Sequence, residues 1–292
     1  MASLLDMRRR IKSVKNTQQI TKAMKMVAAA KLKRAQDRVT ASRPFAGKMA
    51  MVLGDLSSKV AGEFSHPLLD ERGDEKYLIV LISADKGLAG AFNANVIKAT
   101  QAFLKENDGK VDAMIPVGRK GRDFFKRRDV KFGDEYIGLT GSGQVVYADA
   151  VEIARKVIDT FTNDTTIDKV FVVFTEFKTV LSQKPVIEQL LPITKTAVAG
   201  GTETAETEAE YIYEQPAAEI FGKLLPRQVE TQIYKGMLES VASEQGSRMT
   251  AMDSASKNAG ELIDTLTLNM NRIRQAAITK EIIEVVSGAA AA

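Results

Sequence analysis

The feature that most constrains the fold is an unbroken heptad pattern near the C-terminal end of the chain. Small and apolar residues follow one another there at alternating steps of four and three residues. They are Met252, Ser256, Ala259, Ile263, Leu266, Met270, Ile273 and Ala277. This spacing keeps one stripe on the same side of a helix, and it is typical of a left-handed coiled coil.

Helical periodicity covers a much longer stretch, from Pro216 to about Val286. Roughly 60 to 70 helical residues at about 1.5 Å each span on the order of 100 Å, which is more than a single globular domain can contain. Pro226 is predicted to mark a kink or a junction between two helices, because proline removes a helix hydrogen bond.

The N-terminal end, residues 1–60, carries a second helical pattern. Ser3 and Asp6 are predicted to form a capping box at its start, and Pro44 is predicted to kink or interrupt it. Apolar residues recur mainly at three- and four-residue steps: Leu4, Met7, Ile11, Val14, Met24, Ala28, Leu32, Ala35, Val39, Met49, Leu53, Leu56 and Val60.

The two end helices can cover each other's apolar stripes. Because the segment between them returns the chain to its starting point, the pair is predicted to be antiparallel. The alternative is that each end pairs with another copy of the chain. The stripes mix Met, Ala, Ser, Thr and Gln, so the helices can approach closely but bury less apolar surface than in a leucine zipper.

Residues 76–193 follow a different rhythm. Short β-rich runs alternate with helical patterns. The runs are "KYLIVLIS", "KVDAMIPVG" and "KVFVVFTEFK", and the helical patterns lie at 94–107, 119–128 and about 142–161. This alternation predicts an α/β sheet that is partly parallel. "KPVIEQLLPI" is predicted to add a strand, residues 195–210 to form a mobile surface loop, and "YIYEQP" to form a short edge strand.

The predicted organisation therefore has three segments: a helix at 1–60, an α/β domain at 70–215, and a helix at 216–292. The first and the last are expected to form one coiled-coil unit.

Composition excludes several classes of site. The chain has no cysteine and one histidine, His66, so disulfides, thiolate metal sites, multi-histidine metal sites and histidine triads cannot be built. Neither a catalytic set nor a cofactor or metal site is predicted.

No apolar run reaches the roughly 18 to 20 residues of a membrane span, and the first residues do not follow the order of a signal peptide. The chain is expected to be soluble, or peripheral to a membrane.

The first helical segment is strongly basic. Only Asp6 and Asp37 oppose Arg8, Arg9, Arg10, Lys12, Lys15, Lys22, Lys25, Lys31, Lys33, Arg34, Arg38, Arg43 and Lys48. Such a face is either simply solvated or contacts an acidic surface. Nucleic-acid binding is not favoured, because no aromatic residues alternate with these charges and no nucleic-acid module motif is present.

The C-terminal "ITKEIIEVVSGAAAA" is small, apolar and nearly uncharged. It predicts an end that lies inside another protein; simple fraying is the alternative.

The segment "SADKGLAGAFN" at 83–93 places a glycine-bearing turn between a strand and a helix, as many phosphate sites do. Gly87 and Gly90 match neither the dinucleotide fingerprint nor the P-loop, and "GLTGSGQVV" carries Gln144 where the P-loop has lysine. Asp85 and Lys86 have no third group to orient them as an acid/base pair. Structural glycines explain the turn better, while a nucleotide-using α/β enzyme stays the alternative.

Two terminal segments closely resemble the γ subunit of F-type ATP synthases. They are "IKSVKNTQQITKAMKMVAAAKLKRAQ" and "ASEQGSRMTAMDSASKNAGELIDTLTLNMNRIRQAAITKEIIEVVSGAAA". "SADKGLAGAFN" and "SQKPVIEQLLPI" match it in the middle, so the resemblance covers the whole chain. It implies a mixed α+β and α/β fold: a long antiparallel coiled coil of the N- and C-terminal helices plus a central Rossmann-like α/β domain.

The resemblance also implies a function. The chain would be the central-stalk rotor subunit of a proton-transporting ATP synthase, not catalytic by itself and without a cofactor. It would pass rotation of the c-subunit ring to a ring of three α and three β subunits, coupling proton flow to ATP synthesis or hydrolysis. Its other partner would be the ε subunit, with no nucleic acid. It would be peripheral on the cytoplasmic face of the bacterial plasma (inner) membrane, touching the membrane only through the c ring.

The same resemblance assigns contact residues. Contacts with the catalytic ring fall on Lys22, Met24, Lys25, Arg248, Gln275, Thr279 and Glu281. The collar loop falls on Asp85, Lys86 and Gly87, and the foot near the c ring on Tyr211, Tyr213 and Glu214.

Overall fold

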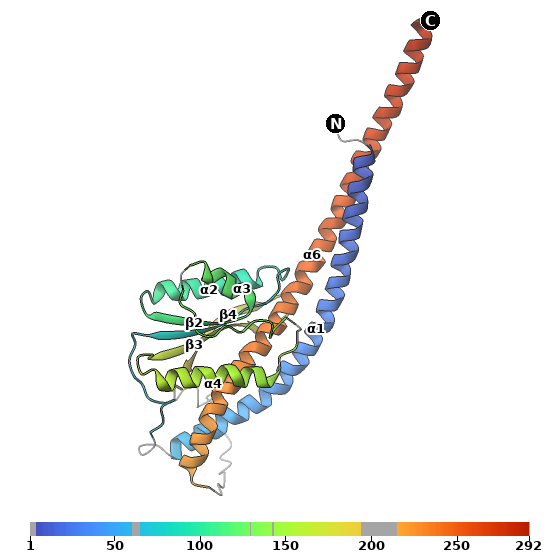
Figure 1. The fold of residues 1–292 in the computed structure, drawn as a ribbon. Coiled ribbons are helices and arrows are strands. Elements are labelled where there is room, and N and C mark those ends of the chain that lie inside the picture. Colours follow the sequence, from blue (N-terminus) through green and yellow to red (C-terminus); the bar gives the residue numbers. More distant parts are fainter. Residues whose placement is uncertain (1–3, 60–64, 129, 142, 194–214, 292) are drawn as a thin grey trace. The chain divides into compact units, whose positions relative to one another are not determined.

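The computed structural model describes residues 4–59, 65–128, 130–141, 143–193 and 215–291 (Figure 1). Its elements are α1 (Leu4–Lys59), β1 (Tyr77–Ile82), α2 (Phe92–Glu106), β2 (Val111–Val117), α3 (Arg119–Lys126), α4 (Tyr147–Asn163), β3 (Lys169–Phe177), β4 (Gln183–Leu191) and α6 (Ala217–Ala291). The two long terminal helices and the central α/β region predicted from the sequence are confirmed. The expected loop at 195–210, Ser3 of the capping box and most of the "YIYEQP" strand lie outside the described residues.

The chain divides into two compact units. One consists of the residues up to 29 and from 248 onward, and the other of residues 30–247. Both long helices therefore contribute to both units, and each unit is described by itself below.

In the larger unit, four strands form one sheet in the order β2-β1-β3-β4. β1 runs parallel to β2 and to β3, with Ile79 opposite Met114 on one side and Phe171 on the other. β4 is antiparallel to β3. The partly parallel sheet and the strand in "KPVIEQLLPI" are thus confirmed. All six residues of β1 are buried, as expected of an apolar strand inside a parallel sheet.

Helices cover both faces of this sheet. Figure 1 shows α2 and α3 on one face and α4 on the other. On the α2 and α3 face, Ile79, Leu81 and Val173 of the strands pack with Val96 of α2 and Phe125 of α3 in one apolar cluster.

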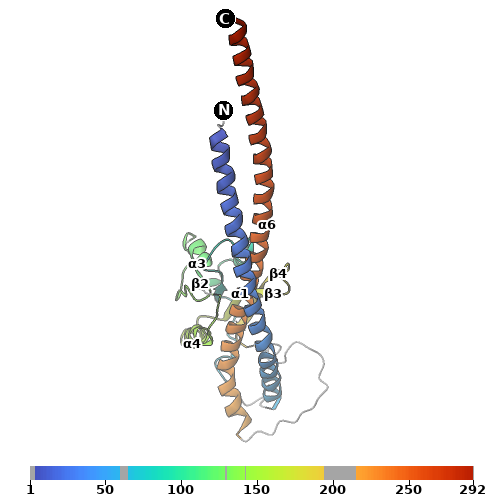
Figure 2. The same cartoon turned by 90° about the vertical axis from the view of Figure 1, so that its right-hand side faces the viewer.

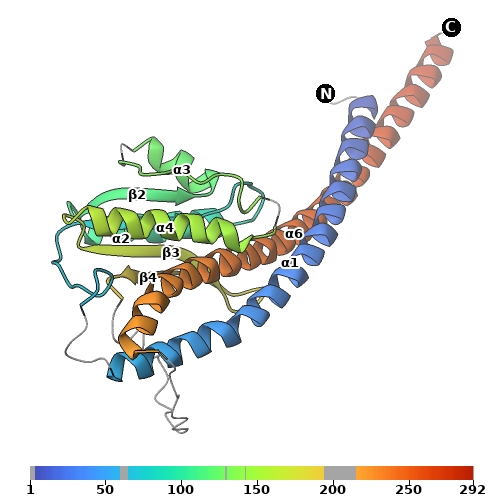
Figure 3. The same cartoon turned by 60° about the horizontal axis from the view of Figure 1, so that its bottom comes forward.

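On the opposite face, α6 lies beside α4 (Figure 3). The rings of Tyr147 at the start of α4 and Tyr234 of α6 meet edge to face at 5.3 Å. Gly236 lets α6 approach the sheet, because a Cβ there would stand 3.1 Å from Ile82 and 3.4 Å from Phe174.

Neither Pro44 nor Pro226 ends its helix, so the interruption or junction expected at these residues is wrong. Pro44 is exposed, and α1 buries Val39 before it and Met49 after it against the rest of the unit. Burial on both sides holds the backbone helical although proline removes one hydrogen bond.

In the smaller unit, α1 and α6 lie side by side (Figure 2). Thr21 meets Ser256, while Lys25, further along α1, meets the earlier residue Asp253 of α6. The pair within this unit is therefore antiparallel. The heptad residues of α6 from Met252 to Ala277 are all buried or half-buried, which confirms the predicted stripe.

Candidate interaction surfaces

A polar cluster interrupts the apolar seam of the helix pair. The hydroxyls of Thr21 and Ser256 lie 2.7 Å apart, and Gln18 donates from Nε2 to the Ser256 carbonyl at 3.3 Å. The Lys25 ammonium donates to Asp253 at 2.6 Å. These partners are only part-buried, and polar partners across a coiled coil favour one register because a shifted pairing leaves them unmatched.

Three of these seam positions were not assigned individually from the sequence, although Gln and Thr were expected among the residue types of the stripe. Gln18, Thr21 and Lys25 continue the four-and-three spacing between Val14 and Ala28. The unbroken spacing was the signal that could have found them.

We expect replacement of Asp253 with asparagine to destabilise the chain more at neutral pH than in acid. The hydrogen bond from Lys25 lowers the pKa of Asp253 below its ordinary value. A carboxyl group with a lowered folded pKa stabilises the fold above its unfolded pKa, about 3.9. This contribution is lost as pH falls through the folded pKa.

The measurement is the urea midpoint of the full chain at pH 7 and pH 3. Asp264→Asn is the matched control, since Asp264 is exposed on the same helix and forms no ion pair within the described ranges. Asp253→Asn should lower the midpoint more at pH 7 than at pH 3, and Asp264→Asn at neither pH. An equal loss at both pH values for Asp253→Asn would contradict the assignment.

The predicted ring-contact residues differ in their exposure. On α1, Lys22 is exposed, whereas Met24 and Lys25 are half-buried beside α6. On α6, Gln275 and Thr279 are exposed, and Thr279 donates its hydroxyl hydrogen bond to the Gln275 carbonyl one turn earlier. Arg248 is half-buried and Glu281 exposed. Their contacts with partners stay predictions, and Tyr211, Tyr213 and Glu214 lie outside the described residues.

The end of α6 presents an unusual apolar surface. Every residue from 278 to 289 is exposed. The large apolar side chains among them are 49% to 71% exposed: Ile278, Ile282, Ile283, Val285 and Val286. Exposed apolar surface of this kind is a candidate interaction site, and its insertion into another protein stays a prediction.

The predicted collar loop is organised by Asp85. Its Oδ1 accepts hydrogen bonds from the backbone N–H of Arg119 at 3.1 Å and of Gly138 at 2.9 Å. Its Oδ2 accepts from the backbone N–H and the hydroxyl of Thr140, at 3.2 Å and 3.0 Å. One carboxylate therefore joins three loops that are far apart in the sequence.

This carboxylate occupies the place where an anionic ligand would be expected. In open α/β sheets, ligands bind outside the carboxyl ends of the strands, with phosphates on helix N-termini. Asp85 lies just past β1 and caps the start of α3, and Ser83 Oγ accepts the N–H of Gly121 in the same turn at 2.9 Å. The donors that could hold a phosphate are thus engaged by the chain's own side chains.

The collar turn also contains a residue that the sequence did not single out. Leu88 has a φ of 63°, a left-handed conformation that is unusual for a bulky residue, and its side chain is 66% exposed. Lys86 beside it is exposed and Gly87 half-buried. Strained, exposed apolar residues in turns are candidates for contact with a partner.

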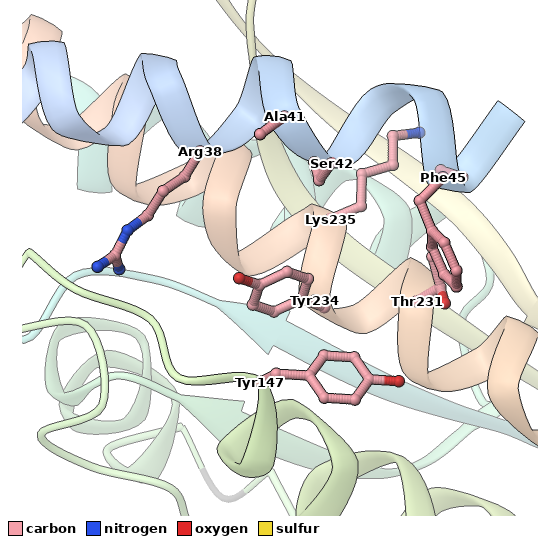
Figure 4. Close-up of a pocket in the computed structure, with 9 residues that line it drawn as sticks. Arg38, Ala41, Ser42, Phe45, Tyr147, Thr231, Tyr234 and Lys235 are labelled. Carbon is pink, nitrogen blue, oxygen red and sulfur yellow. The ribbon is translucent and has the colours of Figure 1, made fainter.

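A groove of about 380 Å³ lies between α1, α4 and α6 in the larger unit (Figure 4). It is lined by Arg38, Ala41, Ser42, Phe45, Ala46, Tyr147, Thr231, Tyr234 and Lys235. In Figure 4 the hydroxyls of the two tyrosines point in opposite directions. Lys235 is 3.7 Å from Glu188, and Arg38 donates to the Val145 carbonyl at 3.4 Å. Small-molecule sites have convergent polar groups, so this groove is an apolar packing surface.

Tyr147 illustrates how the polar groups around this groove are already engaged. Its hydroxyl donates to Glu230 at 2.9 Å. Burial, with this bond to a carboxylate, raises the pKa of Tyr147 to about 12. The hydroxyl therefore stays protonated at physiological pH and holds α4 against α6.

Metal-binding clusters and membrane-spanning helices are absent from the described part of the chain. Within the described ranges, no group of three or more His, Asp or Glu side chains is placed to hold a metal ion. None of the helices in the described part of the chain is long and apolar enough to cross a membrane.

Comparison with known proteins identifies the family. The family model described as ATP synthase matches residues 3–292. The chain is 52% identical to the ATP synthase gamma chain of Solibacter usitatus, with 100% of both chains covered. It is 51% identical to that of Desulforamulus reducens, covering 100% of this chain and 99% of the relative.

Solved structures give the same result. The central stalk and c ring of the Tetrahymena thermophila mitochondrial ATP synthase contain a chain that is 28% identical, with a TM-score of 0.62 over 81% of this chain and 99% of that one. A rotor chain of the Euglena gracilis mitochondrial enzyme shares the fold, with a TM-score of 0.63, 19% identity and coverage of 94% and 98%. The chain therefore belongs to the ATP synthase gamma chain family.

Proposed function

We propose that this chain is the central-stalk rotor subunit of a proton-transporting ATP synthase. The observation that carries the proposal is the antiparallel pair of α1 and α6, joined by a part-buried polar cluster, from which an apolar end of α6 continues with every side chain from 278 to 289 exposed. A stiff helical pair with an uncovered apolar end is suited to a shaft that turns inside a sleeve of other subunits.

The chain acts mechanically in this proposal and performs no chemistry itself. The nucleotide-enzyme alternative depends on the glycine turn, where Asp85 and Ser83 engage the N–H groups that a phosphate would need. Catalysis is assigned to the α and β subunits around the shaft. Rotation would couple proton flow to ATP synthesis or hydrolysis.

The contacts follow from the exposed surfaces. Lys22, Met24 and Lys25 on α1, with Arg248, Gln275, Thr279 and Glu281 on α6, are assigned to the catalytic ring. The apolar end of α6 would fill an apolar bearing in that ring. Asp85, Lys86 and Gly87 are assigned to the collar, and Leu88 joins them because it is the exposed apolar residue of that turn.

The remaining partners would be the ε subunit and the c ring, with Tyr211, Tyr213 and Glu214 assigned to the foot. Contact with the membrane would be only through the c ring, on the cytoplasmic face of the bacterial plasma membrane. The Tetrahymena central stalk, whose structure includes a c ring, supports this arrangement.

ATP hydrolysis in three mixtures tests the proposal: this chain alone, a compatible ring of α and β subunits alone, and the two together. We expect no turnover by the chain alone and a large rise in sustained turnover on mixing. Hydrolysis by the isolated chain, or no rise with a ring shown by gel filtration to bind it, would contradict the rotor function.

A further inference from the structure

One stretch of α6 is buried on every side although much of it is polar. All residues from 236 to 246 are buried, including Glu239, Ser240, Ser243, Glu244 and Gln245. Glu239 is 4% exposed. Charged side chains are almost never buried in this way unless they have partners.

The polar side chains of this stretch reach the backbone of β3. Ser240 Oγ accepts the N–H of Thr175 at 3.1 Å, and Ser243 donates to the carbonyl of the same residue at 3.1 Å. Glu239 Oε2 accepts the N–H of Phe177 at 2.9 Å. All three hydrogen bonds are buried.

These backbone groups are available because the neighbouring strand is too short. The pairing of β1 with β3 stops at Leu81 and Val173, whereas β3 continues to Phe177 and pairs with β4 as far as Gln183. The end of β3 therefore has an unpaired edge on the β1 side. Buried backbone groups need partners, and α6 supplies them in place of a strand.

Glu239 links a third element. Its Oε1 lies 3.5 Å from the Arg43 guanidinium of α1. Further along α6, Ser247 donates to Gln183 Oε1 at 2.9 Å, and Gly246 is close enough to the β3–β4 connection for a Cβ to stand 3.4 Å from Phe177. One buried carboxylate thus contacts both α1 and β3 from its place on α6.

We propose that Glu239, Ser240 and Ser243 form a torsional clamp, which fixes the rotation of α6 about its own axis relative to the sheet. The inference rests on the proposed rotor function. Apolar contacts are non-directional and tolerate sliding and rotation of a packed helix. Hydrogen bonds to a strand backbone are directional, so a twist applied to the α/β domain passes to α6 without slipping, and Arg43 couples α1 to the same movement.

The test measures torsional stiffness in the assembled complex of this chain with a ring of α and β subunits. The chain has no cysteine, so Lys105→Cys on the exposed end of α2 gives a single attachment point for a bead. The ring is fixed to a surface, rotation is stalled by withholding ATP, and the angular variance of the bead is recorded. Thermal variance rises as the connection between bead and shaft softens.

We expect Glu239→Ala and Ser243→Ala each to raise the angular variance by about twofold, because each leaves a directional contact unmade. Glu239→Gln keeps an acceptor for the Phe177 N–H and should remain near the wild-type value. Glu219→Ala is the matched control, since Glu219 is exposed on the same helix and pairs with Lys223.

The clamp would be overturned if an assembled Glu239→Ala or Ser243→Ala complex showed the wild-type angular variance. This holds even if the urea midpoint of the variant falls, because a purely structural role lowers stability without softening the shaft. If Glu239→Ala does not assemble, the milder Ser243→Ala decides. A wild-type chain that neither joins the ring nor rotates would instead contradict the rotor function, so the two failures are distinguishable.

Discussion

Replacement of Gly118 with alanine is expected to lower the free energy of unfolding by at least about 4 kcal/mol, enough to prevent folding of a marginally stable chain. Gly118 has a φ of 109°, which disfavours any residue with a side chain. An added Cβ would stand 2.1 Å from the carbonyl oxygen of Ser83 and 2.7 Å from its carbonyl carbon. Both are backbone atoms at the buried end of β1, so neither can move aside.

Gly109 provides the control for backbone conformation. It also has a positive φ, 76°, but no atom lies within 4 Å of the position that a Cβ would take. Gly109→Ala should therefore cost only about 1 kcal/mol. Urea unfolding of the full chain, followed by circular dichroism, compares the two. Equal losses would show that conformation, and not the contact with Ser83, determines the effect.

The close approach at Gly118 is what positions the collar loop. The backbone N–H of Gly118 donates to Tyr136 at 2.8 Å, and Arg119 follows with its N–H on Asp85. Without this approach, the start of α3 would stand too far from β1 for Asp85 to cap it. The collar surface assigned to the rotor therefore depends on a residue distant from Asp85 in the sequence.

Local patterns were sufficient to predict the elements. The alternation of β-rich and helical runs predicted β1 to β4 and the helices between them, because apolar periodicity depends on neighbouring residues alone. The heptad spacing likewise predicted the paired stripe that ends near Ala277. The interruption expected at Pro44 is wrong, because burial on both sides of a proline is a tertiary effect that outweighs the local rule, whereas the kink stays a prediction.

The candidate surfaces could be predicted only in part, because they are formed by contacts between residues far apart in the sequence. Asp85 was considered with its neighbour Lys86 as an acid/base pair, whereas its partners are 34 to 55 residues away. Glu239 and the serines after it were not singled out, because the strand register that leaves the end of β3 without a β1 partner is a tertiary contact. Gln18, Thr21 and Lys25 were not assigned to the seam individually, because only the apolar positions of the first helix were listed, although Gln and Thr were expected among the residue types of the stripe.

Replacement of Asp85 with alanine should lower the free energy of unfolding by about 3 kcal/mol, because the carboxylate accepts three backbone N–H groups and one hydroxyl. Asp85→Asn should lose about half as much, since its amide keeps an acceptor oxygen but turns an NH₂ group toward other donors. Urea unfolding at pH 7 measures both. A loss for Asp85→Ala no larger than for Asp85→Asn would contradict the role of the carboxylate.

Asp85→Ala also tests whether the Asp85 carboxylate takes the place of a bound phosphate beside this sheet. With Asp85 removed, the N–H groups of Arg119, Gly138 and Thr140 still point at one place next to the start of α3, which suits an anion. Inorganic phosphate that binds this place with millimolar affinity should restore about 1 kcal/mol to Asp85→Ala at 10 mM. It should add nothing to the wild type at matched ionic strength. Equal stabilisation of both proteins would mean that phosphate acts elsewhere. Selective rescue would mean that a single internal carboxylate separates this domain from a phosphate-binding fold, so that the chain can serve as a shaft without holding a nucleotide of its own.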